Sequence, residues 1–120
     1  MVGTSMADGS PQVTPVWCDF DNGHIRINSA KGRTKDRNLR RDPSISLCVD
    51  GGRDDTRYVI VYGTTSLIEP GADGQEELRR AIIRKYHQTP EAGDAYYESA
   101  AKNPAAIIVI SPEKILIGNF

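Results

Sequence analysis

The chain has 120 residues, of which 38% are hydrophobic and 26% charged, and its formal net charge is −1. These values are typical of a single globular domain with one core. No apolar run is long enough to span a bilayer, and the N-terminus has neither the basic start nor the apolar core of a signal peptide. We therefore expect one cytoplasmic domain over residues 1–120. Its two cysteines, Cys18 and Cys48, are expected to be buried free thiols, with a disulfide between them as the alternative.

The first half of the chain predicts β-strands joined by short turns. Strands are expected over residues 2–6, 12–20, 24–28, 44–49 and 57–68. Pro11 and Pro15 cannot donate to a β-ladder, so part of the second strand should lie at a sheet edge, a bulge or a barrel rim. Asn22-Gly23 supplies the positive φ angles of a tight hairpin turn, and Gly63 indicates a bend or bulge in the longest strand. Strands this close in sequence should pair antiparallel.

The pattern changes to a helical period after residue 72. Asp73 with Glu76 resembles a capping box, and an apolar stripe predicts an amphipathic helix over residues 74–87. The bases on this helix that suit the helix dipole and need no ligand to explain them are Arg79, Arg80, Arg84 and Lys85. We further expect a loop over 88–94, a short helix over 95–101, and strands over 105–110 and 114–118 with a turn between them. The chain should therefore contain six or seven strands, one amphipathic helix and one or two short helices. Because these elements do not alternate as βαβ units, they predict a small and mostly antiparallel barrel.

A basic segment follows the strand at 24–28 and gives the candidate site. Between Lys31 and Asp42 it holds six basic residues and two acids. Asp42-Pro43 ends any helix there, and Thr34 is expected to be the N-cap of a short helix. Cations in its first turn would lie at the positive end of the helix dipole, which costs about a few tenths of a kcal/mol per charge. A bound anion would remove this conflict, so we predict a phosphate site, with a solvated surface helix as the alternative. The cations concerned are Lys31, Arg33 and Lys35.

The chain shows no equipment for acid–base or nucleophilic catalysis of its own. Its two histidines, His24 and His87, are not in a metal-ligand spacing, and there is no nucleophile elbow, Walker loop or dinucleotide fingerprint. We expect no catalytic side chain and no metal site, so in an enzyme a cofactor would carry the reaction. Trp17, the only tryptophan, is either a core residue or a planar surface for a planar ligand.

Three segments of the chain carry a resemblance to a known family. They are residues 8–17 (DGSPQVTPVW), residues 28–43 (NSAKGRTKDRNLRRDP) and the strand at 58–63. Together they resemble the split β-barrel flavin- and deazaflavin-binding proteins of the pyridoxamine 5′-phosphate oxidase-like superfamily, in the branch known as F420-dependent oxidoreductases. The resemblance covers nearly the whole chain.

This resemblance implies a homodimer of split barrels of the FMN-binding type, with the cofactor at the subunit interface. The residues that it places at the cofactor phosphate are Lys31, Arg33, Thr34 and Lys35, with Lys35 first. Those that it places along the cofactor or near its ring system are Asn28, Ser29, Val16 and Trp17. Members of the family usually begin with a helix and a fuller first strand, so we expect this N-terminal helix and part of the first strand to be absent here.

The implied function is a cofactor-dependent oxidoreductase in which reduced coenzyme F420 passes hydride to a small unsaturated substrate. An FMN-binding protein of pyridoxamine 5′-phosphate oxidase type is the alternative, because both cofactors carry a phosphate on a ribityl chain. A carrier that binds the cofactor without catalysis fits the lack of acid–base residues equally well. Nucleic acid is not expected as a partner, because no aromatic-rich basic sheet face is present, and neither is a membrane.

Overall fold

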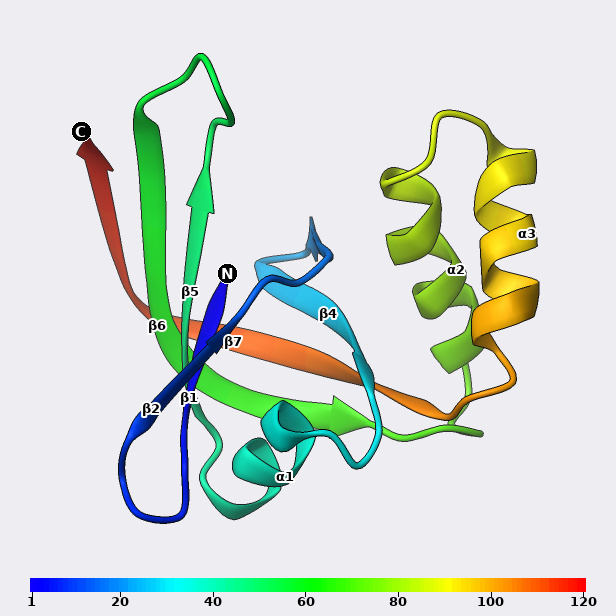
Figure 1. The fold of residues 1–120 in the computed structure, drawn as a ribbon, viewed down its shortest axis with the longest axis horizontal. Coiled ribbons are helices and arrows are strands. Elements are labelled where there is room, and N and C mark those ends of the chain that lie inside the picture. Colours follow the sequence, from blue (N-terminus) through cyan, green and yellow to red (C-terminus); the bar gives the residue numbers. More distant parts are fainter.

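The computed structural model describes all 120 residues as one seven-stranded sheet with three helices (Figure 1). The strands are β1 (Val2–Ser5), β2 (Pro11–Thr14), β3 (Cys18–Asp21), β4 (His24–Ala30), β5 (Ser44–Asp50), β6 (Arg57–Ile68) and β7 (Ala105–Asn119). The helices are α1 (Thr34–Arg41), α2 (Gln75–Lys85) and α3 (Pro90–Ala100). The strand order is β2-β1-β5-β6-β7-β4-β3, and every neighbouring pair is antiparallel. The predicted mainly β, antiparallel split barrel is confirmed.

Proline sets the two edges of the sheet. The single strand expected over residues 12–20 is broken near Pro15 into β2 and β3, which lie at opposite edges. Because proline has no N–H to donate, the chain cannot continue as one paired strand there. The turn between β3 and β4 has φ angles of 51° at Asn22 and 77° at Gly23, as the hairpin prediction required.

The two longest strands, β6 and β7, form the centre of the sheet. Their register shifts between Tyr62 and Gly63, at the glycine predicted to bend the strand. A Cβ on Gly63 would clash with the carbonyl oxygen of Ser111, so only glycine permits this close approach. The turn expected at 111–113 is wrong, because Pro112 lies opposite Gly63 within the register shift and β7 continues through it.

The core lies inside the curved sheet and fixes α1. Its buried members are Val2, Ile25, Ile27, Leu39, Ile45, Leu47, Val61, Ile108 and Ile110. Leu39, the α1 residue in this cluster, is 3% exposed. Burial of one such side chain stabilises the fold by about 1.5–3 kcal/mol. This contact holds α1 against the barrel, and with it the basic segment that begins the helix.

Helices α2 and α3 form a hairpin that stands beside the barrel (Figure 1). Helix α3 is longer than the expected helix at 95–101, because the side chain of Thr89 accepts a hydrogen bond from the Ala92 N–H (3.1 Å) and Pro90 begins the helix. The loop expected over 88–94 is therefore wrong from Pro90 onward. The capping box at Asp73 is wrong as well, since α2 follows Gly74 in a left-handed conformation without a side-chain cap.

Both cysteines are free thiols, as expected. The expectation that both are buried is wrong, because Cys18 on β3 is half-buried and Cys48 on β5 is exposed. None of the three helices combines the length and the apolar character needed to cross a membrane.

Candidate functional site

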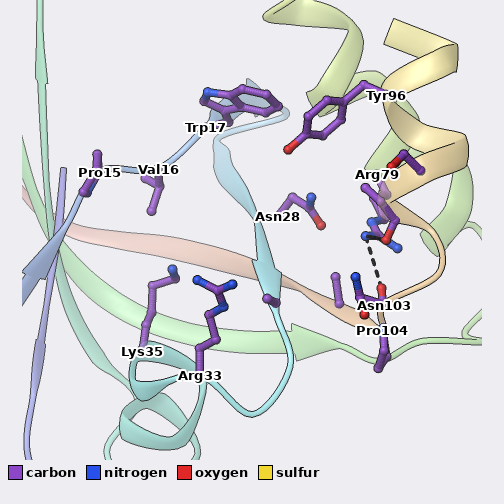
Figure 2. A pocket seen from close by; sticks show the side chains of 14 residues that line it. Pro15, Val16, Trp17, Asn28, Arg33, Lys35, Arg79, Tyr96, Asn103 and Pro104 are labelled. Atoms are coloured by element: carbon purple, nitrogen blue, oxygen red, sulfur yellow. Dashed lines mark hydrogen bonds between the residues drawn. The ribbon is translucent and has the colours of Figure 1, made fainter.

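A pocket of about 610 Å³ opens between α1, β4 and the α2–α3 hairpin (Figure 2). This volume is within the usual range for small-molecule sites. The predicted cofactor residues that line it are Val16, Trp17, Asn28, Arg33 and Lys35. The predicted residues that do not line it are Ser29, Lys31 and Thr34. The lining contains no carboxylate, so the pocket favours an anionic ligand.

Two cations at the start of α1 face this pocket without a partner in the protein. Arg33 is the N-cap residue, its side chain makes no capping hydrogen bond, and Lys35 lies in the first turn. The expected N-cap, Thr34, is instead the first helical residue. Burial, and then the neighbouring charge of Arg33, lower the pKa of Lys35. The carboxylate of Asp36, in the same first turn, partly opposes this lowering of the pKa, but it pairs with Arg40. Arg33 and Lys35 thus lie together at the positive end of a helix without an ion-pair partner of their own, which is the arrangement that a phosphate would neutralise.

The other four bases of the segment contact groups of the protein instead. Lys31 lies 3.6 Å from the carboxylate of Glu69, which Arg40 also contacts at 2.7 Å. Arg40 reaches the buried carboxylate of Asp36 at 3.1 Å as well. The two arginines that donate to backbone carbonyl oxygens are Arg37 and Arg41. Within this segment, Arg33 and Lys35 are therefore the bases that line the pocket and have no hydrogen-bond or ion-pair partner in the protein.

Strand β4 carries two polar side chains that were predicted to lie along the cofactor, and they point to opposite faces of the sheet. Asn28 points into the pocket, and its Oδ1 atom is buried without a hydrogen-bond donor (Figure 2). Ser29 points to the other side, where it is 1% exposed and its hydroxyl also lacks a partner. An unsatisfied buried oxygen costs about 1–3 kcal/mol. A ligand that donates a hydrogen bond to Asn28 would offset this cost.

Trp17 is held in an aromatic cluster at one side of the pocket. Its ring stacks on Tyr86 with 5.1 Å between centroids and 9° between planes. His87 and Tyr96 lie 5.6 and 5.2 Å from it. The Tyr86 hydroxyl in turn accepts from the Cys18 N–H at 2.9 Å, which ties α2 to β3. Because Tyr86 covers one face of the indole, a ligand can use only its other face or its edge.

The helical wall of the pocket was not predicted from the sequence. Arg79 on α2 is 7% exposed and lines the pocket together with Tyr96 and Asn103. The sequence predicts Arg79 only as a base that complements the helix dipole and needs no ligand. Its spacing holds a usable signal, because Arg79 precedes the buried Ile82 and Ile83 by three and four residues and so shares their face.

The family model for pyridoxamine 5′-phosphate oxidase matches residues 1–117. The chain belongs to this family. The pocket lies where strand β4 leads into the basic loop and α1.

Several solved structures share the fold of this protein. A conserved hypothetical protein from Mycobacterium tuberculosis superposes with a TM-score of 0.78 at 23% identity, over 98% of this chain and 74% of that chain. An F420 reductase gives 0.72 at 24% identity, over 96% and 86%. A FAD-binding protein from Mesorhizobium loti gives 0.65 at 22% identity, over 95% and 80%. At these identities the similarities establish the split-barrel fold.

Proposed function

We propose that this protein is an oxidoreductase that binds coenzyme F420 in the pocket and reduces a small unsaturated substrate. The observation that carries the proposal is the pair of unpartnered cations, Arg33 and Lys35, at the start of α1. The family assignment and the fold shared with an F420 reductase support it. FMN is the second candidate cofactor, and the fold shared with a FAD-binding protein favours a flavin in this pocket. The two unpaired cysteines suit action in the reducing cytoplasm.

The residues present fit such a cofactor. Arg33 and Lys35 would hold the phosphate, and Asn28, with its unsatisfied Oδ1, would accept a hydrogen bond along the chain or ring. Val16 and Trp17 would bound the ring system. When bound, the cofactor would supply the hydride, so no pocket side chain has to act as the reductant. The task of the protein is then to bind, orient and exclude water.

We also propose that the active form is a homodimer with the cofactor at the interface. The sheet exposes apolar side chains on one face: Ile117 is 82%, Ile115 55% and Val49 44% exposed. Ile117 on β7 pairs with Val59 on β6, and Val59 pairs with Val49 on β5. These three residues therefore form an apolar row across the three strands. These strands project from the barrel as an arm (Figure 1). An exposed apolar row of this kind is typical of a protein–protein interface.

Replacing Ile117 with aspartate tests the homodimer. The side chain contributes little to the monomer core, so the variant should fold normally but sediment as a monomer under conditions where the wild type is a dimer. Sedimentation velocity over a range of concentrations measures the change. A wild-type protein that stays monomeric throughout would overturn the proposal.

Titration with F420 and with FMN, followed by the fluorescence of Trp17, tests the cofactor. We expect F420 to quench tightly and FMN weakly, with a shallow salt dependence because the phosphate lies in a pocket. If only FMN binds tightly, the cofactor of this protein would be a flavin and not F420. If the protein binds the cofactor but turns over none of a panel of unsaturated substrates, it would instead be a cofactor carrier. If neither cofactor binds, the oxidoreductase proposal is wrong.

A further inference from the structure

Arg79 forms a second cationic end of the pocket, separate from the one at α1. It lies on α2 and is 7% exposed. Figure 2 shows it on the opposite side of the pocket from Arg33 and Lys35, with Asn28 between the two sides. The pocket thus has a cationic group at each end and no carboxylate between them.

Much of the Arg79 guanidinium is unsatisfied. Its Nη2 atom donates to the carbonyl oxygens of Ala100 (2.9 Å) and Asn103 (3.3 Å). Its Nε atom is buried without any acceptor, and Nη1, which keeps some accessible surface, donates to no group of the protein either. Arginine is almost never this buried unless it is paired. The guanidinium therefore has unpaired donors, and the residue that carries them lines the pocket.

No acidic side chain neutralises Arg79. The adjacent residue on the helix, Arg80, collects the nearby carboxylates instead, at 3.2 Å from Glu76, 3.6 Å from Asp94 and 3.3 Å from Glu98. Arg79 has only the two carbonyl oxygens at the end of α3 and the edge of a cation–π contact, 5.6 Å from the ring centroid of Tyr97. The two hydrogen bonds of Nη2 cap the end of α3. The remaining donors of Arg79 and its positive charge have no role in that cap.

The surroundings of Arg79 indicate what it binds. A phosphate at Arg33 and Lys35 would match those two charges and leave the single charge of Arg79, which one carboxylate would match. Tyr96 presents an aromatic ring beside it, and Asn103 a polar side chain. We propose that Arg79 binds the carboxylate of a planar, conjugated substrate, whose plane packs against Tyr96. This inference deepens the proposed function and takes its pocket as given.

Two-dimensional ¹⁵N–¹H spectra of the protein test this inference, with trans-cinnamate and methyl cinnamate as probes. The acid and the ester share the conjugated plane and differ in charge. We expect the acid to shift the Nε–H resonance of Arg79, assigned by its loss in Arg79→Lys, and the ester to bind about tenfold more weakly or worse. Equal affinity of acid and ester in the wild type would overturn the inference without any variant.

Variants separate binding from a structural role. Arg79→Gln should reduce cinnamate affinity about tenfold or more, Arg79→Lys should retain part of it, and the matched control Arg80→Gln should leave it unchanged. In all three variants F420 and FMN titrations should match the wild type. Loss of cofactor affinity in a folded Arg79→Gln protein would instead assign Arg79 to the cofactor and overturn the inference. Carboxylate binding that depends on Arg79 in a protein that binds neither cofactor would support the subsite while refuting the oxidoreductase proposal.

Discussion

Replacing Lys35 with methionine should weaken cofactor binding and leave the fold at least as stable as before. Burial, and then the charge of Arg33, lower the pKa of Lys35 from its ordinary 10.5, so the folded protein holds the charged amine less favourably than the unfolded chain does. That penalty is present at neutral pH, begins to fall as the pH rises through the folded pKa, and is gone above the unfolded value of 10.5. Methionine has nearly the same length and helix propensity, and it removes the charge. The free energy of unfolding in urea at pH 7 should therefore stay level or rise.

The loss of binding follows from one charge-assisted contact. A hydrogen bond to a charged group contributes about 1.5–3 kcal/mol, which is about 10- to 100-fold in the dissociation constant. Titration of F420 and FMN against Trp17 fluorescence measures it. The matched control is Lys31→Met, because Lys31 lies in the same segment but pairs with Glu69 outside the pocket; it should change affinity by about twofold at most. Equal losses in both variants would mean that the segment acts through its diffuse charge, and the reasoning would be refuted.

Three further substitutions test the scaffold that positions the site. Gly63→Ala should destabilise the fold by about 1–3 kcal/mol in urea unfolding, because its Cβ meets the Ser111 carbonyl, whereas Gly3→Ala, with its nearest atom 3.6 Å away, should be nearly neutral. Thr89→Ala removes the cap of α3 and should cost about 1 kcal/mol, which the same assay would show; an unchanged midpoint would contradict the capping role. Although burial raises the pKa of Asp36, hydrogen bonds from Arg40 and from the Gly32 N–H outweigh this and lower it. Its stabilisation is therefore present above the unfolded pKa of about 3.9 and is lost as the pH falls through the lower folded value. Asp36→Asn should be less stable than the wild type at pH 7 by about 1–3 kcal/mol, with a gap that narrows at acid pH; a constant gap would contradict the assignment.

Local rules predicted most of the sheet. The Asn22-Gly23 turn, the bulge at Gly63 and the edge positions of β2 and β3, on either side of Pro15, each follow from a local backbone preference, and each is confirmed. The same local reasoning failed where tertiary pairing decides. Pro112 predicts a turn by itself, but the register shift opposite Gly63 accommodates it inside β7.

Helix α3 was underestimated although its signal was present. Thr89 followed by Pro90 is a capping residue followed by a favoured first helical residue, although the stretch lacks a strong apolar stripe. The lesson for such sequences is that capping chemistry can outweigh weak periodicity.

The sequence predicted which segment forms the candidate site, but not which of its basic residues face the pocket. The helix-dipole argument identified the basic segment, but it could not distinguish Arg33 and Lys35 from Lys31 and Arg40. Lys31 and Arg40 both form ion pairs with Glu69, which follows β5 and β6 in the sequence and so is distant along the chain. The α2–α3 wall with Arg79 also comes from distant sequence, so only the fold brings it to the pocket.

A crystal structure of the protein with F420, and in parallel with FMN, would show which residues hold the cofactor. We expect the cofactor phosphate at hydrogen-bond distance, about 3 Å, from both Lys35 Nζ and the Arg33 guanidinium, with the ring system beside Val16 and Trp17. A phosphate held by Lys31 or Arg37 outside the pocket, or a cofactor bound away from α1, would contradict this expectation.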